Sequence, residues 1–328
     1  MPHSRHISVP LAAASVIALA LTGCTSQPVE SDETDATAPA TSEYPLTIDN
    51  CGTEITIDGA PQRIVTIKSS TAELLLALGL EERLVGVAAL DGPLPDETEV
   101  DIVSDSVPGQ EAVLALEPDF VFAGWESNFS AEGAGERERL EEFGVETYVA
   151  PAACKRDGYM PDPLTFEFVF DSIAEAGVIF DAREAADELL TEQRAALESV
   201  EPVDDAPSAL WYSSGRATPY VGAGIGSPQM IMDAAGLDNI FADIDDSWSS
   251  VSWETVVAAN PEVIVLVDSD WNTAESKIAV LEENPATAAL DAVREGRYVV
   301  LPFAATEAGV RNVEAVTSAV EQLRELGW

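Results

Sequence analysis

Aromatic and basic side chains recur just after the predicted β-strands of this sequence, and together they could hold a flat, negatively charged molecule. Aromatic faces stack on conjugated rings, and ammonium or guanidinium groups bind carboxylate or phosphate through charge-assisted hydrogen bonds. Lys68 and Ser69 also stand at a predicted helix start, where free backbone N–H groups favour an anion. The candidate ligand-binding residues are Lys68, Ser69, Trp125, Arg156, Tyr159, Tyr212, Arg216, Tyr220, Trp271, Phe303 and Arg311.

Catalysis by an imidazole is excluded for the mature chain, because the two histidines, His3 and His6, fall in a segment that is predicted to be removed. A Ser-His-Asp or Cys-His system and a histidine-ligated zinc or manganese site are therefore ruled out. No loop has the regular spacing of acidic residues that an all-carboxylate calcium site uses. We expect a protein that is not an enzyme and that has no metal and no cofactor.

One enzymatic alternative stays open, namely an exported hydrolase that works with paired carboxylates. Glu126 and Asp270 each follow a predicted strand and could form such a pair. The glycine run at residues 222–226 has G-x-G-x-G spacing, which differs from the dinucleotide-binding pattern. It indicates a turn, or a place where backbone N–H groups approach a ligand. Three further tryptophans are expected to serve in packing: Trp211, Trp248 and Trp253.

The charge balance of the chain restricts its partners. Its 328 residues include 59 acidic and 16 basic ones, for a net charge of −43. This argues against nucleic acid and against anionic membrane surfaces as partners. Hydrophobic residues make up 46% of the chain, so we expect a packed core. In an oxidising compartment Cys51 and Cys154 could form one disulfide.

The first 43 residues indicate export and attachment to a membrane. Residues 1–23 combine a basic start with an apolar run and are typical of a signal peptide. The run ends in Leu-Thr-Gly-Cys, which resembles a bacterial lipobox and predicts lipidation of Cys24. Residues 24–43 are polar and acidic and predict a disordered tether. The predicted location is extracytoplasmic, at the outer face of the cell membrane, with a lipid anchor.

The body of the chain contains one structural unit twice. "EAVLALEPDFVFAG" begins at Glu111 and "ETVVAANPEVIVLV" begins at Glu254, and each predicts a short helix followed by a buried strand. Strands and helices alternate around both units, which favours mostly parallel sheets flanked by helices. The segment from Ala182 to Val200 lacks glycine and proline and predicts one long helix.

These patterns predict an α/β fold with two lobes joined by a long, rigid linker helix. The expected divisions are an N-terminal lobe at residues 44–163, linker helices at 164–202 and a C-terminal lobe at 203–328. In parallel sheets ligands bind beyond the carboxyl ends of the strands. We therefore expect one cleft between the strand-end loops of the two lobes.

The chain resembles solute-binding lipoproteins of ABC importers, specifically the iron-siderophore and cobalamin periplasmic-binding family. The resemblance rests on "RIVTIKSSTAELLLALGLEERLVGV", on the "LEPDFVFAG" and "ANPEVIVLV" units and on the linking helix. It implies a monomer that partners an ABC permease dimer with its ATPase subunits. It also implies that Glu111 and Glu254 dock on the two permease subunits, although each glutamate could simply complement the positive end of its helix.

A narrower resemblance concerns the ligand. "YPLTIDNCG", "TPYVGAG", "WETVVAANPEVIVLV" and "PFAATEAGVRNVEAV" are similar to segments of actinobacterial lipoproteins that are proposed to bind a phospholactyl deazaflavin precursor. A ferric siderophore or cobalamin would satisfy much of the same chemistry. A lipoprotein that senses or scaffolds without transport is a further alternative.

Overall fold

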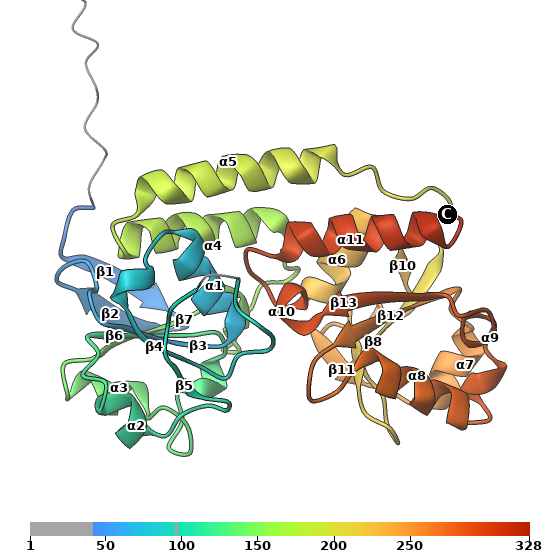
Figure 1. Cartoon of the computed structure of the whole chain (residues 1–328), viewed down its shortest axis with the longest axis horizontal. Coiled ribbons are helices and arrows are strands. Elements are labelled where there is room, and N and C mark those ends of the chain that lie inside the picture. The colour runs from blue at the N-terminus through green and yellow to red at the C-terminus, as the bar shows by residue number, and fades with distance from the viewer. Residues whose placement is uncertain (1–41, 96–97) are drawn as a thin grey trace, which may run out of the picture. The chain divides into compact units, whose positions relative to one another are not determined.

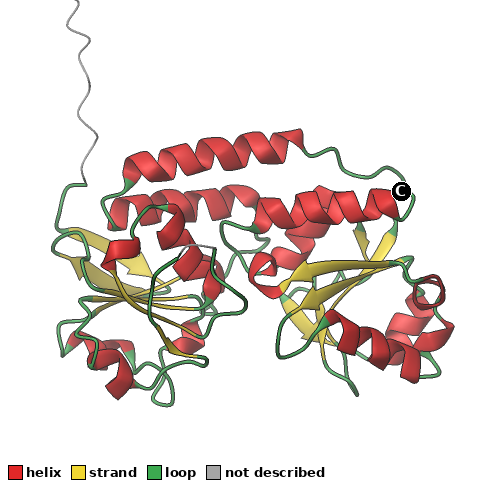
Figure 2. Cartoon of the chain, viewed as in Figure 1, coloured by secondary structure: helices red, strands yellow, loops and turns green. Residues whose placement is uncertain are grey.

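A computed structural model describes residues 42–95 and 98–328 of the chain. The predicted signal peptide, Cys24 and nearly all of the predicted tether lie outside the described residues. Figure 1 shows two lobes, each with a central sheet flanked by helices, and Figure 2 shows strands and helices alternating through both. The predicted α/β class is confirmed. Among the described residues no helix combines the length and the apolar composition that crossing a bilayer requires.

The first lobe is built on a sheet of five parallel strands in the order β5-β4-β3-β6-β7. Every position of β3 and β6 is buried, as expected for parallel strands that are covered on both faces. The strands are β3 (Ile64–Ile67), β4 (Leu84–Ala88), β5 (Ile102–Ser104), β6 (Phe120–Ala123) and β7 (Glu146–Val149).

A separate antiparallel hairpin precedes this sheet. Strand β1 (Leu46–Asn50) pairs with β2 (Thr53–Ile57). Cys51 and Gly52 form the two-residue turn, and both have positive φ angles, of 54° and 76°. Turns of this kind match the twist of a hairpin.

Short helices connect the strands of the first lobe. Strand β3 leads directly into α1, so the first turn of this helix lies at the carboxyl edge of the sheet. The helices are α1 (Ser69–Ala77), α2 (Gln110–Leu114) and α3 (Arg137–Glu141), with 3₁₀ turns η1 (Glu81–Arg83), η2 (Glu126–Asn128) and η3 (Pro151–Ala153).

Two helices link the lobes, and they pack side by side along one side of the molecule (Figure 1). The first is helix α4 (Phe166–Ile179). Just before it, the Leu164 amide donates a hydrogen bond to the Ile225 carbonyl oxygen of the second lobe, at 2.8 Å. Helix α5 (Arg183–Ser199) returns after a short turn and leads into the second lobe. Its bounds match the long helix that the sequence predicts.

The second lobe contains a sheet with the main path β11-β9-β8-β12-β13, with β10 paired to β8. Strands β8, β10, β12 and β13 are parallel, but β9 and β11 are antiparallel additions that the sequence does not predict. The strands are β8 (Ser208–Ser214), β9 (Tyr220–Gly222), β10 (Asp238–Asn239), β11 (Trp248–Ser250), β12 (Val263–Asp268) and β13 (Tyr298–Pro302).

Helix α6 of this lobe begins without a side-chain cap. Gly226 occupies the capping position, and Ser227, whose residue type commonly caps helices, is instead the first helical residue. The Ser227 hydroxyl instead donates to the Thr306 carbonyl oxygen at 2.6 Å. The helices are α6 (Ser227–Ala235), α7 (Trp253–Ala259), α8 (Ala274–Glu283), α9 (Asp291–Glu295), α10 (Phe303–Thr306) and α11 (Asn312–Glu325), with the 3₁₀ turn η4 (Thr287–Ala289).

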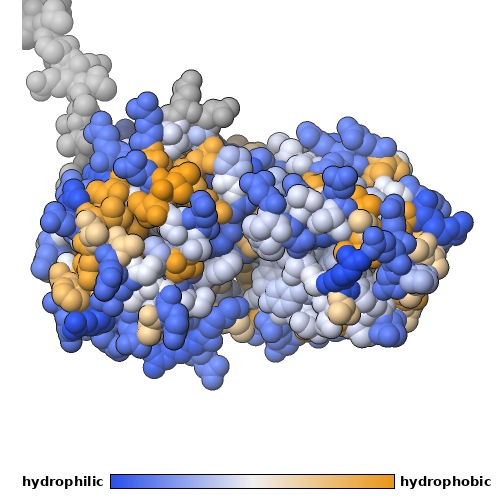
Figure 3. Space-filling view, turned by 60° about the horizontal axis from the view of Figure 1, so that its bottom comes forward, coloured by the Kyte–Doolittle hydropathy of each residue, from blue (hydrophilic) through white to orange (hydrophobic). Residues whose placement is uncertain are grey.

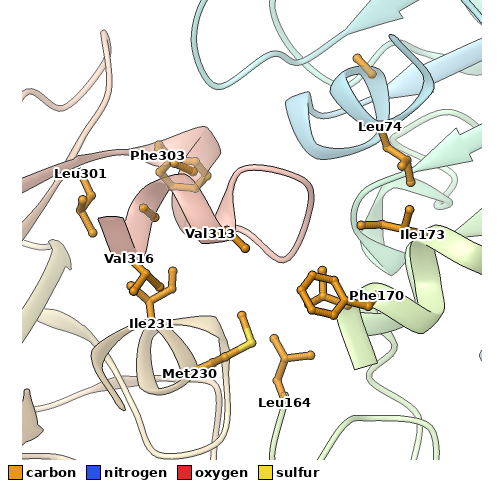
Figure 4. Packing of buried hydrophobic residues seen from close by; sticks show 14 of the residues in the cluster. Leu74, Leu164, Phe170, Ile173, Met230, Ile231, Leu301, Phe303, Val313 and Val316 are labelled. Carbon is orange, nitrogen blue, oxygen red and sulfur yellow. The ribbon is translucent and has the colours of Figure 1, made fainter. Parts of the chain in front are cut away.

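One hydrophobic core continues from the first lobe into the second. Figure 4 shows Phe170 and Leu164 on one side facing Met230 on the other, and these residues belong to a single buried cluster. Burial of each such side chain contributes about 1.5–3 kcal/mol. The shared core therefore fixes the two lobes against each other on the side of the linker helices.

Candidate ligand-binding site

A cavity of about 530 Å³ lies between the lobes and is lined by residues of both. Figure 3 shows the corresponding hollow between the two lobes. Its volume falls within the range of small-molecule sites, which is about 300–1,000 Å³. The side chains that give it its character are aromatic, namely Trp125, Tyr220, Trp248, Trp271 and Phe303, or charged, namely Glu126, Lys155 and Glu307.

Strand ends of both sheets place these side chains. Trp125 follows β6, Trp271 follows β12 and Phe303 follows β13. Because parallel strands end at the same edge of a sheet, loops that are distant in sequence converge there. The sequence predicted these three residues and Tyr220 for the ligand site, and all four line the cavity.

Trp125 lines the cavity and connects the first lobe to the second. Its indole Nε1 donates to Glu307 Oε2 of the second lobe at 2.7 Å. The Lys68 ammonium lies 3.9 Å from the centre of its ring, within the range of a cation–π contact. These two contacts hold the indole in place.

Lys68 supports Trp125 from behind and does not line the cavity. Its ammonium pairs with the buried Asp91 carboxylate, and its own side chain is 7% exposed. Its backbone has φ 90° and ψ 149°, a conformation that is nearly restricted to glycine and costs about 1–3 kcal/mol elsewhere. Ser69 is also fully buried, and its hydroxyl oxygen accepts from the Asp91 amide at 2.8 Å. The ammonium of the predicted anion site is therefore already paired with an internal carboxylate.

The charged groups of the cavity are few and of both signs. Lys155 is the one basic residue among the described residues that line it. The Lys155 amide donates to Glu126 Oε2 at 2.6 Å, which fixes the loop that carries the lysine. Burial raises the pKa of Glu307, while the hydrogen bond from Trp125 and the charge of Lys68 act in the opposite direction.

Aromatic residues of the second lobe form the opposite wall. The rings of Tyr220 and Trp248 stack with centroids 6.0 Å apart and an interplanar angle of 15°. Trp271 meets Phe303 edge-on at 5.7 Å. The sequence favours a packing role for Trp248, but its side chain lines the cavity. It lies on β11, a strand too short to leave a pattern.

The remaining predicted ligand residues of the first lobe lie away from the cavity. Arg156 Nη1 donates to the Gly52 carbonyl oxygen at 2.8 Å, and the Tyr159 hydroxyl donates to Asp49 Oδ2 at 2.6 Å. Both side chains therefore hold the β1–β2 hairpin. Cys51 and Cys154 are joined by a disulfide, with Cα atoms 5.3 Å apart, and this bond attaches the same hairpin to the Lys155 loop.

The remaining predicted residues of the second lobe also have internal partners. Tyr212 is buried and its hydroxyl donates to the Gly215 carbonyl oxygen at 3.0 Å. Arg216 forms an exposed ion pair with Glu283. Arg311 lies beside Glu314 at 3.2 Å and reaches Glu73 of the first lobe at 3.5 Å. None of these three residues lines the cavity.

The glycine run packs closely against its own lobe, and its last two residues line the cavity. A Cβ atom on Gly224 would lie 2.0 Å from the Ala242 carbonyl oxygen, so only glycine fits there. Ile225 and Gly226 line the cavity. The run therefore serves to bring the backbone close to both the lobe and the cavity.

The two acids of the hydrolase alternative are placed differently. Glu126 lines the cavity, whereas Asp270 is exposed and absent from its lining. Across residues 42–95 and 98–328, no group of three or more His, Cys, Asp or Glu residues is arranged to hold a metal ion.

The two glutamates that are expected to dock on a permease lie on opposite lobes. Glu111 stands in the first turn of α2 and Glu254 in the first turn of α7, and both are exposed. Figure 1 shows both helices on the side of the lobes away from α5.

Comparisons with known proteins show the family to which this fold belongs. The model of the periplasmic binding protein family matches residues 64–305. An uncharacterised ABC transporter substrate-binding lipoprotein of Bacillus subtilis is 26% identical over 329 residues, which cover 95% of each chain. A cobalamin-binding protein of Halobacterium salinarum is 29% identical over 242 residues, which cover 70% of this chain but only 60% of that protein.

A solved structure shares the fold over nearly the whole of its length. The ABC-type Fe³⁺-hydroxamate transport system from Saccharomonospora viridis has a TM-score of 0.72 and 27% identity, over 86% of this chain and 99% of that one. This match agrees with the predicted pair of lobes, and the family model covers well over half of the chain. The resemblance inferred from the sequence is thus confirmed, and the chain belongs to the periplasmic binding protein family.

Proposed function

We propose that this chain is the solute-binding component of an ABC importer and that it captures a flat conjugated ligand with an acidic group between its lobes. The observation that carries the proposal is the set of five aromatic side chains, from both lobes, around a cavity with a single basic side chain in its described lining. Aromatic walls stack on conjugated rings, while one lysine suits one acidic group. A ligand with many negative charges would meet Glu126 and Glu307 as well.

The phospholactyl deazaflavin precursor fits this arrangement best. Its fused rings would lie among the aromatic side chains, and one of its two acidic groups, the phosphate or the lactyl carboxylate, would lie toward Lys155. A cavity of about 530 Å³ suits a drug-sized molecule of this kind. A second candidate is a corrinoid, because a 29% identical relative is named as a cobalamin-binding protein. A whole cobalamin is much larger than the cavity, so it would require the lobes to move apart.

The same proposal includes delivery of the ligand to a permease in the membrane. Glu111 and Glu254 would bind the two subunits of a permease dimer, one glutamate from each lobe. Lipidation of Cys24 would hold the chain at the outer face of the cell membrane, and the protein would act there as a monomer. The relative named as an ABC transporter substrate-binding lipoprotein supports this assignment.

Titration of purified protein with three chromophores tests the ligand. The probes are a phospholactyl deazaflavin, cyanocobalamin and a ferric hydroxamate, and the readout is quenching of tryptophan fluorescence. We expect the deazaflavin to bind most tightly. Lys155→Gln should weaken its binding by roughly tenfold or more, as for the loss of a hydrogen bond to a charged group. Arg156→Gln is the matched control, because this neighbouring cation lies outside the cavity, and it should bind like the wild type. Equal effects of the two substitutions would contradict the proposed site.

Charge reversal tests the delivery. Glu111→Arg combined with Glu254→Arg should abolish uptake of the ligand by cells and leave its affinity for the purified protein unchanged. Glu184→Arg combined with Glu192→Arg makes the same change of charge on the exposed face of α5 and should leave uptake intact. Normal uptake with the first pair would refute docking through these residues.

A further inference from the structure

Trp271 stands in a short loop at the edge of the cavity. The loop joins β12 to α8. The Trp271 side chain lines the cavity and packs edge-on against Phe303, yet this residue is 64% exposed. A side chain with so little packing of its own depends on the backbone beneath it. That backbone is tied by local hydrogen bonds, because the Asn272 amide donates to the Ser269 carbonyl oxygen at 3.0 Å and the Ala274 amide donates to Asp268 Oδ1 at 2.6 Å.

A buried lysine lies directly under this loop. Lys277 of α8 is 1% exposed, and its ammonium donates to the carbonyl oxygens of Val267 and Asn272. One of these acceptors belongs to the end of β12, and the other is the residue after Trp271. A single ammonium therefore joins the two ends of the loop.

Burial of the Lys277 ammonium costs free energy, and its two hydrogen bonds to the loop are the role that the structure shows for it. Burial lowers the pKa of Lys277 to about 8, and the Asp268 carboxylate acts in the opposite direction. An apolar side chain would fill the same space without desolvating a charge. It would, however, leave the two carbonyl oxygens without their shared donor.

We propose that Lys277 is a positioning residue of the ligand site, whose ammonium holds the loop at residues 269–273 so that Trp271 forms a wall of the cavity. The inference rests on the proposed function for its second half, because it assigns to Trp271 a part in ligand binding. Its first half concerns the protein without ligand and is tested separately.

Hydrogen exchange of the ligand-free protein tests the first half. In Lys277→Met, the amides of residues 269–274 should exchange at least about tenfold faster than in the wild type, while the amides of β8 and β12 change little at matched stability. Leu281→Ala is the matched control, because Leu281 lies on the same helix, is fully buried and does not contact the loop through a hydrogen bond. Leu281→Ala should lower the stability of the whole protein without selectively faster exchange in the loop.

Lys277→Gln has a shorter side chain but keeps an N–H donor. It should give an intermediate exchange rate, and it serves as the test if Lys277→Met does not fold. Wild-type exchange of the loop in the folded variants would overturn the proposal.

Affinity tests the second half with the phospholactyl deazaflavin as probe. Lys277→Met and Trp271→Ala should each weaken binding by about tenfold, and the double variant should lose little more than either alone, because both changes remove the same wall. Additive losses would show that the lysine acts on something other than Trp271. Faster loop exchange in a protein whose wild type binds none of the three chromophores would sustain the positioning role and reject the ligand assignment.

Discussion

The Glu73–Arg311 pair predicts that stability falls as the pH rises, which is opposite to the usual behaviour of an acid in an ion pair. Glu73 lies on α1 of the first lobe and is 5% exposed, while Arg311 precedes α11 of the second lobe. Burial raises the pKa of Glu73 from 4.5 to about 7, although Arg311 acts to lower it, and Glu314 and Asp91 raise it further. Within the described residues, its Oε2 atom has no hydrogen-bond partner.

The sign and size of the effect follow from proton linkage. Between pH 4.5 and 7 the folded chain holds a proton on Glu73 that the unfolded chain has lost, so unfolding becomes easier as the pH rises. Each pH unit between the two pKa values lowers the free energy of unfolding by about 1.36 kcal/mol. The total loss is therefore roughly 3 kcal/mol by pH 8. Glu73→Gln imitates the protonated acid. It should match the wild type within about 1 kcal/mol at pH 5 and exceed its free energy of unfolding by roughly 2–3 kcal/mol at pH 8.

Urea unfolding followed by circular dichroism at pH 5, 6, 7 and 8 measures these differences. Glu314→Gln is the matched control, because it removes the other carboxylate beside Arg311 from an exposed position, with 63% of its side chain accessible. It should change stability by less than about 0.5 kcal/mol at every pH. If Glu73→Gln is less stable than the wild type at pH 8, the attraction to Arg311 outweighs burial and the reasoning is wrong.

Two further predictions concern stability. Lys68→Met leaves the Asp91 carboxylate buried without its partner and should lower the free energy of unfolding by about 3–5 kcal/mol, and Lys68→Met with Asp91→Leu should recover much of this loss. Both are measured by urea unfolding, and an unchanged midpoint in the single variant would contradict the pairing. Replacing Cys51 and Cys154 by serine opens a covalent loop with a sequence separation of 103 and should cost about 4.7 kcal/mol. Thermal melting with and without a reductant checks this value, and a wild type that is insensitive to reduction would count against it.

The fold was predictable because its main strands are continuous apolar runs. "RIVTI", "FVFAG" and "VIVLVD" are buried almost throughout, and each stands next to a helix with its own stop signal. Strands β9 and β11 have three residues each and mix polar with aromatic side chains, so they carry no periodic pattern. Trp248 lies on one of them, which is why its place in the cavity wall was not foreseen.

The aromatic half of the site was predictable, and the basic half was not. Residues that follow parallel strands emerge at one edge of their sheet, so Trp271 and Phe303 lie together in the second lobe. Trp125 leaves the corresponding edge of the first lobe and meets them because the two edges face one cleft. A long basic side chain instead turns toward whichever acid the fold supplies. Lys68 finds Asp91 at 23 residues' separation and Arg311 finds Glu73 at 238, and a sequence read by itself does not contain such pairings. The neighbours Lys155 and Arg156 differ for the same reason. Lys155 lines the cavity, whereas Arg156 turns to the Gly52 carbonyl oxygen of the hairpin.

The central claim is that the cavity between the lobes holds a conjugated ligand and releases it chemically unchanged. Native mass spectrometry combined with an absorption spectrum of the protein purified from its own host tests this most directly. We expect a non-covalent mass of a few hundred daltons, of the order of a drug-sized ligand, with a visible or near-ultraviolet band that leaves the protein on unfolding with its mass unaltered. A protein that carries no chromophore after incubation with an extract of that host, or that returns the chromophore chemically altered, would contradict the account.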